Sequence, residues 1–500
     1  MTITHENPVG RIIEGTVHPP YLQMTNEKII LRHLVATVLS EFFKQNPIRF
    51  TKVEDLIVDW SGPLAASDLR HFCRNNDTLR NSLRNIVPES MHDQIGLDGV
   101  SWIDRIAGPE SRLARVEEEV CSDYQELEVL VEELIKEKKY KHLNALEKRK
   151  DTIADEKTLD FLSRKAVIPK YGFPVDVVEL ENRYEGGDSY GVLLQRDLSQ
   201  AIAEYAPGGK VIANKREWES CGVKTVTGKT WTVRNYRYEN AQSFTQWNEN
   251  DSSIPPGENS KYLIPEFGFV TPLFERPKEP HGRVRRLYTT RPFFQGFDDK
   301  KTPEIKTILG VQITKAQPGT LVILCEGRHR SGFYICRSCG AHMTGPRGKH
   351  ESPSGYKCPG TLERFSLGHE LLTDVVRLQF PQLSGEWETY SVAYAVLLGA
   401  AETLDVPGAD LNVTVARGVN LGESAIVLYD DVPGGAGLVA QLERENIFKE
   451  MLRNALERVQ GNCGCDQSCY GCLRSYRNQF AHPYLNRMRA WEILNSIVAL

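Results

Sequence analysis

Four cysteines near the carboxyl end of the chain have the spacing Cys-x-Cys-x3-Cys-x2-Cys. They are Cys463, Cys465, Cys469 and Cys472. Thiolates this close in sequence can surround one ion if the chain turns tightly, which glycines such as Gly464 permit. A closed shell of four sulfur ligands is typical of structural zinc. An iron–sulfur cluster also takes four cysteines and stays open as an alternative, as does a group of unrelated thiols.

A second group of possible ligands begins with the pair Cys336-x2-Cys339 and continues with Cys358. A zinc site of this kind has four ligands in a tetrahedron, so the spacing predicts a second zinc ion with one further ligand. A redox role for the pair is disfavoured because no βαβ pattern surrounds it. A reduced cysteine pair without metal remains the alternative.

The fourth ligand of this second site is open among His350, His342 and Cys325. We favour His350, because the glycine-containing loop over residues 345–355 lets it fold back toward the cysteines. His342 follows Cys339 too closely to close the same shell easily.

The composition describes a water-soluble, globular chain of several domains. Of 500 residues, 40% are hydrophobic and 25% are charged, and the net charge is −5. Neither a disordered nor a membrane protein has this composition, and no stretch predicts a signal peptide or a membrane span. We therefore expect a cytoplasmic protein without membrane partners. Thiols stay reduced there, which favours metal sites over disulfides.

One local basic patch stands out against the negative net charge. Between residues 276 and 291 there are six basic residues and one acidic residue. Arginines beside aromatic residues suit a nucleic-acid strand, through phosphate pairing and base stacking. A solvated loop, with Tyr288 in a core, is the alternative. The predicted nucleic-acid contacts are Arg276, Arg283, Arg285, Arg286, Tyr288 and Arg291, with Arg474 and Arg477 beside the C-terminal cysteines.

A predicted strand ends in two carboxylates, Asp430 and Asp431, and a glycine loop follows it. Such a loop at the start of a helix exposes backbone N–H groups that can hold an anion such as a DNA phosphate. The predicted anion loop consists of Gly434, Gly435 and Gly437. A tight turn that lets the helix pack on the sheet is the alternative.

Hydrophobic periodicity places these motifs in an α+β or α/β multidomain chain. The five predicted regions are a helical region over 1–110, a long helix or coiled coil over 111–165, a β-rich domain over 166–335, a zinc knuckle over 336–362 and an α/β domain with the four-cysteine site over 363–500. Helices are predicted over residues 27–43, 111–150, 371–380, 390–404 and 438–460, and strands over 175–180 and 425–431. Asn26 is predicted to cap the first helix.

Three segments carry a resemblance to a known family: Leu-Tyr-Asp-Asp-Val-Pro-Gly-Gly-Ala-Gly over 428–437, Leu-Gly-His-Glu over 367–370 with Thr373 and Asp374, and the closing cysteine motif. Together they resemble the MrfA-like zinc-binding domain. This is a C-terminal module of certain superfamily 2 DNA helicases, also found in the DrmB subunit of the DISARM phage-defence system. The resemblance implies that the four C-terminal cysteines bind zinc. Weaker similarity extends upstream, over 169–176, 204–208 and 15–20.

The helicases of this family carry a motor with a Walker loop, and this sequence has none. The segment ending in Gly228, Lys229 and Thr230 lacks the required earlier glycine and predicts a hairpin turn instead. The resemblance therefore implies an accessory subunit, or a split part, of a helicase encoded nearby, with DNA as a partner. Defence or DNA repair is the expected setting. The alternative is a metal-dependent nuclease that uses Asp430, Asp431 or His369.

Overall fold

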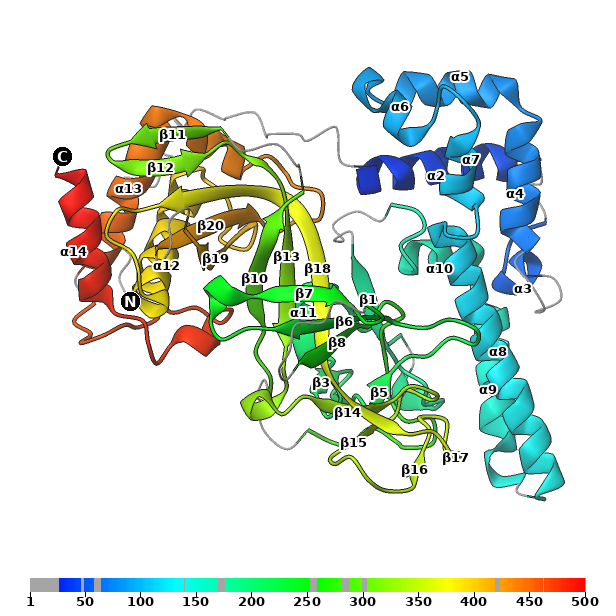
Figure 1. Cartoon of the computed structure of the whole chain (residues 1–500). Coiled ribbons are helices and arrows are strands. Elements are labelled where there is room, and N and C mark those ends of the chain that lie inside the picture. Colours follow the sequence, from blue (N-terminus) through cyan, green and yellow to red (C-terminus); the bar gives the residue numbers. More distant parts are fainter. Residues whose placement is uncertain are drawn as a thin grey trace.

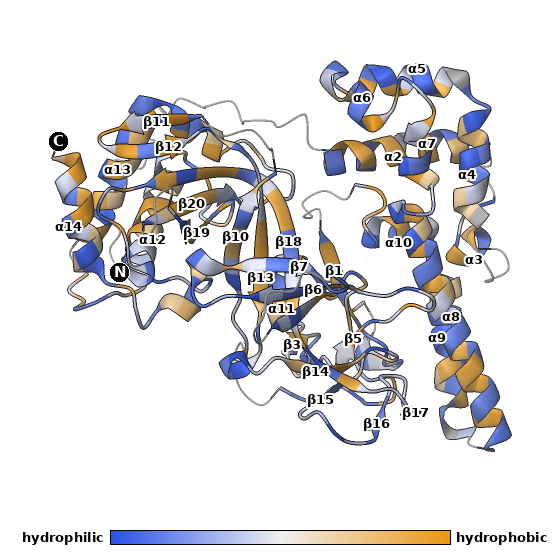
Figure 2. Ribbon diagram, in the orientation of Figure 1, coloured by the Kyte–Doolittle hydropathy of each residue, from blue (hydrophilic) through white to orange (hydrophobic). Residues whose placement is uncertain are grey.

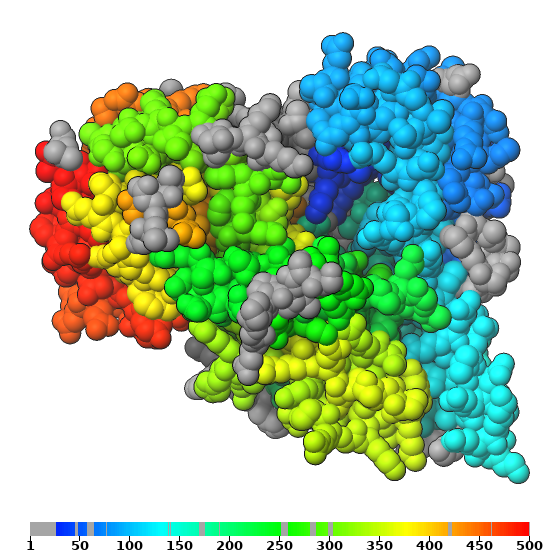
Figure 3. Space-filling view, viewed as in Figure 1, coloured from blue at the N-terminus to red at the C-terminus, as the bar shows by residue number. Residues whose placement is uncertain are grey.

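The computed structural model of the protein has a helical N-terminal region, a β-rich middle and a C-terminal α/β region that carries a cysteine cluster (Figure 1). This arrangement confirms the predicted fold class. In Figure 3 the helical region forms one side of the molecule and the C-terminal helices form the opposite side. The structure describes residues 27–45, 49–57, 64–138, 140–169, 176–189, 191–251, 259–280, 287–298, 304–418, 423–461 and 463–499.

The N-terminal helices pack their apolar faces into a core of their own, which includes Leu34, Leu69 and Trp102. The first described helix confirms the prediction from periodicity, whereas its predicted cap, Asn26, lies outside the described residues. The helices are α2 (Glu27–Gln45), α3 (Val53–Leu56), α4 (Leu64–Arg74), α5 (Asp77–Ile86), α6 (His92–Ile95), α7 (Ser101–Ala107), α8 (Arg112–Lys136), α9 (Leu143–Ala154) and α10 (Thr158–Arg164).

The long helix predicted over residues 111–150 is two helices. The chain reverses after α8, where Lys138 has a φ of 57°, and α9 returns along α8 as an antiparallel hairpin (Figure 1). Both helices carry alternating polar and apolar bands in Figure 2. Lys150 on α9 lies over the ring of Tyr124 on α8, 5.0 Å from its centroid. The repeating apolar residues therefore face a helix of the same chain.

Most strands of the middle and C-terminal regions share one twelve-stranded sheet. Its strands are β6 (Thr232–Arg237), β7 (Thr245–Asn248), β8 (Ser260–Ile264), β10 (Arg291–Phe297), β11 (Ile305–Ile308), β12 (Val311–Thr314), β13 (Gln317–Cys325), β14 (Phe333–Cys336), β15 (His342–Met343), β18 (Leu362–Gln379), β19 (Leu411–Arg417) and β20 (Ser424–Asp430). Smaller sheets contain β1 (Val177–Glu181), β2 (Gln195–Asp197), β3 (Lys210–Ala213), β4 (Arg216–Glu219), β5 (Gly222–Val223), β9 (Phe269–Val270), β16 (His350–Glu351) and β17 (Lys357–Cys358).

The predicted helix over residues 371–380 is wrong, because this segment is the second half of β18. Leu371 and Leu372 occupy opposite faces of the strand, so Leu371 is buried and Leu372 is 44% exposed. Strand β18 pairs with β13 along nine residues and also with β8, β12, β14 and β20. Pairing with distant strands overrides the helix-like spacing of its apolar residues.

Helix α12 (Glu386–Thr403) packs on strands β19 and β20, and two further helices, α13 (Glu445–Gln460) and α14 (Arg487–Val498), pack on α12. The first two, and strand β20, confirm the elements predicted there. Between the middle strands lies α11 (Leu198–Glu204). A turn at Gly228 connects β5 to β6, as predicted, but the two strands belong to different sheets and form no hairpin. Across the described residues, no helix combines the length and the apolar character needed to cross a bilayer.

A buried ammonium group joins the helical region to the β-rich middle. Lys224, only 1% exposed, lies 2.9 Å from Glu119 and 2.5 Å from Asp123, both on α8. It also lies 2.6 Å from Glu181 on β1. Burial alone would lower the pKa of Lys224, but the three carboxylates raise it well above its ordinary value. Each charge is thus compensated inside the interface.

Replacing Lys224 by methionine should destabilise this interface, because it removes the cation that the three buried carboxylates share. Glu119 and Glu181 keep ion pairs with Lys165 and Arg149, whereas Asp123 has its next cation, Arg183, at 3.9 Å. Loss of one partner from a buried ion pair costs roughly 3–5 kcal/mol. The loss should be larger at neutral pH than below about pH 6, because burial raises the pKa of Asp123 to about 6 and its protonated carboxyl no longer needs a cation. Lys165 and Lys224 lower the pKa of Glu119 to about 2, so that carboxylate keeps its need for a cation. Thermal melting and limited proteolysis between α8 and β1 would measure it.

Lys229→Met is the matched control. Lys229 forms its ion pair with Glu118 on the same helix, at 2.8 Å, but both side chains are about one-third exposed (34% and 30%). Such a pair contributes about 0–1 kcal/mol. Equal melting temperatures for the two variants would contradict the role given to Lys224.

Candidate metal centres and the adjoining cavity

One candidate metal centre contains the pair Cys336 and Cys339. These two cysteines lie on a tight turn, the knuckle, between β14 and β15. The N–H of Gly340 donates to the carbonyl of Cys336 at 2.8 Å, which turns Cys339 back toward Cys336. Gly340 has a φ of +73°, and a Cβ there would lie 1.8 Å from the carbonyl oxygen of Val223. Only glycine fits this position, so the knuckle packs directly against the β5 segment.

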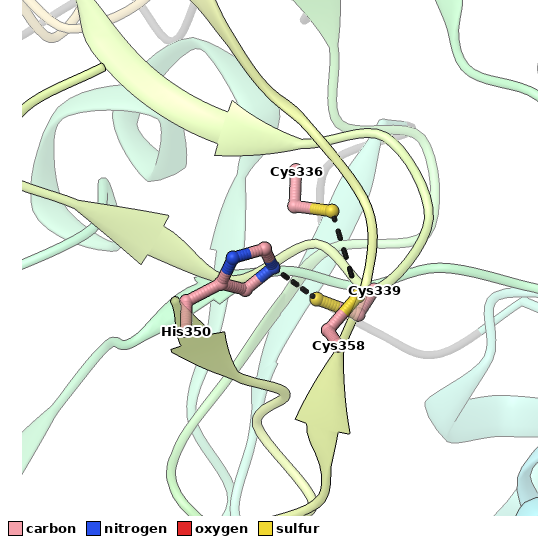
Figure 4. Close-up of side chains that lie close together, drawn as sticks. All are labelled: Cys336, Cys339, His350 and Cys358. Carbon is pink, nitrogen blue, oxygen red and sulfur yellow. Dashed lines mark hydrogen bonds between the residues drawn. The ribbon is translucent and has the colours of Figure 1, made fainter. Parts of the chain in front are cut away.

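A second hairpin delivers the other two ligands to this centre. In the β16–β17 pair, His350 lies directly opposite Cys358. The Nε2 atom of His350 is 3.4 Å from the Sγ of Cys339, and the Sγ of Cys358 is 3.8 Å from that of Cys336 (Figure 4). One ligand atom from each of the four residues lies within 4.8 Å of the others.

The other two candidates for the fourth ligand lie outside this group. Cys325 is fully buried in the main sheet core, where it pairs with Leu367 across β13 and β18. His342 lies on β15 beside the ring of Phe333, and burial lowers the pKa of its imidazole. The geometry therefore favours His350, as its position in the loop predicted.

The other candidate centre consists of the four C-terminal cysteines, in the loop that follows α13. The Sγ atoms of Cys463 and Cys465 are 3.4 Å apart, those of Cys465 and Cys472 are 3.7 Å apart, and those of Cys469 and Cys472 are 3.8 Å apart. The backbone N–H of Cys465 lowers the pKa of the Cys463 thiol to about 7, which favours a thiolate.

These sulfur distances fit one tetrahedral zinc ion. Ligand sulfurs about 2.3 Å from zinc lie about 3.8 Å from one another in a tetrahedron. A disulfide would bring two sulfurs to about 2.05 Å. A multi-iron cluster would hold the thiolates farther apart, because its inorganic core lies between them. The donor sets of both centres, one with four sulfurs and one with three sulfurs and an imidazole, therefore fit zinc.

The glycine loop is filled by carboxylates of the chain itself, which corrects the prediction of an anion loop. Asp430 accepts hydrogen bonds from the N–H groups of Ala436, Leu438 and Val439, at 2.7–3.0 Å. Asp374 accepts from the N–H of Gly437 at 3.1 Å. The N–H groups of Gly434 and Gly435 donate to backbone carbonyls. A phosphate finds no free donor among Gly434, Gly435 and Gly437.

The predicted nuclease residues are not assembled into a metal site. Asp430 is occupied by the loop amides, and Asp431 pairs with Arg477 at 2.6 Å. His369 lies in a different cavity, of about 440 Å³, between the helical region and the sheet, which Arg112 and other basic residues also line. Within the described residues, the groups able to hold a metal ion are the two cysteine-containing centres alone.

Several predicted nucleic-acid contacts have structural roles instead. Arg291 is buried against Glu386 and four aromatic rings, so it is closed to phosphate. Tyr288 donates to the carbonyl of Pro207 at 2.8 Å and packs edge-on against Phe333, which corrects its assignment as a stacking platform.

Of the remaining predicted contacts, two are placed by the structure and three lie outside the described residues. Arg276 is exposed and pairs with Asp188 at 2.8 Å. Arg474 donates to Ser468 at 2.9 Å and so braces the cysteine loop. Three arginines of the basic patch lie outside the described residues: Arg283, Arg285 and Arg286.

A cavity of about 500 Å³ adjoins the cysteine loop, and sequence reasoning missed it. Its walls come from seven parts of the chain that lie apart in the sequence: α11, the start of β10, β13, α12, β19, the end of β20 and the segment 473–480. Asp431 and Arg477 line it together with Tyr429, whose hydroxyl has no hydrogen-bond partner among the described residues. In the sequence, only the adjacent carboxylates Asp430 and Asp431 drew attention to this region.

The C-terminal region, with its elements and its four clustered cysteines, can be compared with known families. Residues 392–473 match the MrfA Zn-binding domain. The matched residues include most of α12, strands β19 and β20, helix α13 and all four C-terminal cysteines. The structural reading of this loop as a zinc site and the match to the MrfA Zn-binding domain therefore agree.

Similarity to one relative extends well beyond the MrfA Zn-binding domain. The Druantia protein DruE of Escherichia coli (strain UMEA 4076-1) is 24% identical over 97% of this chain. The chain spans 30% of the length of DruE.

Two crystal structures of the DUF1998 helicase MrfA bound to DNA, one of them also with AMPPNP, are similar to parts of the chain. The first covers 69% of this chain and 40% of MrfA, with 12% identity and a TM-score of 0.32. The second covers 66% and 33%, with 11% identity and a TM-score of 0.25.

Metal analysis should find about two zinc ions per chain. Cys469→Ser and Cys336→Ser should each remove one ion from a different centre and lower stability, because a structural zinc contributes roughly 10 kcal/mol in small domains. Cys73→Ser is the control, since Cys73 is a buried free cysteine outside both centres. Iron with sulfide in the purified protein, or zinc content unchanged in Cys336→Ser, would contradict this assignment.

Proposed function

We propose that this chain is a zinc-binding, nucleic-acid-contacting part of a superfamily 2 DNA helicase assembly that acts in antiphage defence or DNA repair. The observation that carries the proposal is the match of residues 392–473 to the MrfA Zn-binding domain, together with cysteine geometry that fits zinc. The similarity to DruE over nearly the whole chain favours a defence system.

A helicase motor supplies the ATP hydrolysis in this proposal. Lys229, in the one segment that looks like part of a phosphate loop, pairs with Glu118 beside the turn that connects β5 to β6. The motor is encoded nearby or in another part of a longer chain. The proteins that accompany this chain determine whether the defence system is of the DISARM or the Druantia type.

The two zinc centres have a structural role in this proposal. Each fits a closed shell of four protein ligands, and such a shell leaves zinc no position for a water or a substrate. One centre fixes the turn between β14 and β15, and the other fixes the loop after α13. Arg276, which is exposed, and the neighbouring Arg283, Arg285 and Arg286 provide the nucleic-acid contacts in this proposal.

Co-purification with the neighbouring helicase would test the assembly. We expect the chain alone to hydrolyse no ATP, and the helicase to show higher DNA-dependent ATPase activity when the chain is added. ATP turnover by the chain alone that Lys229→Ala abolishes would contradict the division of labour. A helicase that neither binds the chain nor responds to it would contradict the accessory role.

Single-stranded DNA binding should weaken steeply with salt, because log affinity falls by roughly 0.7 per phosphate contact for each unit of log salt. Arg283→Ala with Arg285→Ala should flatten that slope by about one to two units and weaken binding to all sequences alike. The control is Arg49→Ala with Arg84→Ala, two partly exposed arginines of the helical region in ion pairs of 2.9 and 2.7 Å. An unchanged slope in the first variant would remove the basic patch from the function.

A further inference from the structure

We propose that the cavity beside the cysteine loop binds one unstacked nucleobase of a DNA strand, of the kind that carries an exocyclic amino group. The inference rests on the proposed function, because it assumes that the chain contacts nucleic acid. It adds a defined site to that function, away from the basic patch. Cytosine and adenine are the bases it fits best, and thymine fits least.

The apolar side of the cavity has the shape and chemistry of a slot for a flat ring. Helix α12 presents Tyr394, Leu397, Leu398 and Ala401 to it, at the spacing of one helix face. Phe480 lines the same cavity from the C-terminal segment. The volume of about 500 Å³ is ample for one base, and proteins commonly hold splayed-out bases against aromatic side chains.

The polar end of the cavity offers hydrogen-bonding groups that the protein leaves unused. Tyr429 is fully buried, and its hydroxyl has no partner among the described residues. A buried polar group without a partner is unfavourable, and a ligand that bonds to it recovers that loss. The unmatched hydroxyl therefore points to a ligand with a polar edge.

Asp431 supplies the acceptor for an amino group. Its carboxylate is paired through Oδ2 with one guanidinium nitrogen of Arg477, at 2.6 Å, and its side chain is 10% exposed. Burial raises the pKa of Asp431 to about 6, so at neutral pH the group is ionised and accepts hydrogen bonds. An amino group on cytosine or adenine donates to such a carboxylate, whereas thymine has no amino group to donate.

Arg477 places a positive charge next to this polar end. Its side chain is 37% exposed, and the same nitrogen that pairs with Asp431 also donates to the carbonyl of Ala409 at 3.1 Å. A guanidinium that is partly open to solvent suits the phosphate of a nucleotide whose base occupies the slot. An apolar slot, an acceptor and a cation together match one nucleotide of a strand.

The test uses the zinc-loaded full chain and end-labelled single strands of one length: oligodeoxycytidine, oligothymidine and a strand with central abasic positions. The wild-type chain should bind oligodeoxycytidine about tenfold more tightly than the other two. Tyr429→Phe should remove most of this preference without loss of stability, because the lost hydroxyl has no protein partner. Leu398→Trp, which fills the slot, should do the same.

Tyr205→Phe is the matched control. Tyr205 is also fully buried with an unpartnered hydroxyl, but it does not line the cavity. Its loss should leave the preference for oligodeoxycytidine unchanged. Competition with free deoxycytidine monophosphate tests whether the cavity takes a free nucleotide or a base within a strand. If the ligand is a strand, oligodeoxycytidine should bind more tightly than the mononucleotide.

The possible results separate the base site from the wider function. Equal binding of all three strands, unaffected by Tyr429→Phe, would overturn the base site and leave the DNA-binding role intact. A preference lost equally in Tyr205→Phe would also overturn it. No binding of any strand would overturn both proposals. Tight binding of the mononucleotide alone would show a nucleotide pocket and overturn the strand as its source.

Discussion

One long strand holds the middle and C-terminal parts of this protein together. Strand β18 runs unbroken over eighteen residues and pairs with five other strands along its length. Its first residues pair with β14, which leads into the knuckle, and its last residues pair with β20, which leads into the loop at Asp430. The positions of the cysteine-containing knuckle and of the C-terminal domain are therefore set by a single backbone.

Local sequence spacing was enough to predict which residues come together in the two candidate metal centres. The four C-terminal cysteines need only one tight loop, and His350 reaches Cys339 through a short hairpin. In both cases the ligands come from segments close in sequence, so spacing limits how they can meet. The same holds for α2, α12 and β20, whose apolar patterns are undisturbed by distant partners.

Contacts between distant segments explain the predictions that failed. Arg291 is a buried structural residue because Glu386 and four aromatic rings surround it, and only one of these rings, Phe293, lies nearby in the sequence. The second half of β18 has helix-like spacing, yet distant strands pair with it on both sides. The cavity beside Tyr429 could not be predicted from the sequence for the same reason, since its walls come from seven separate segments.

The ion cluster around Lys224 has a consequence for how this protein responds to ionic strength. Dissolved salt weakens attractions between exposed charges, but it screens charges in a closed interior much less. Lys224 and its carboxylate partners lie almost entirely out of solvent. Salt concentrations that weaken the exposed ion pairs of the surface should therefore leave the helical region attached to the β-rich middle.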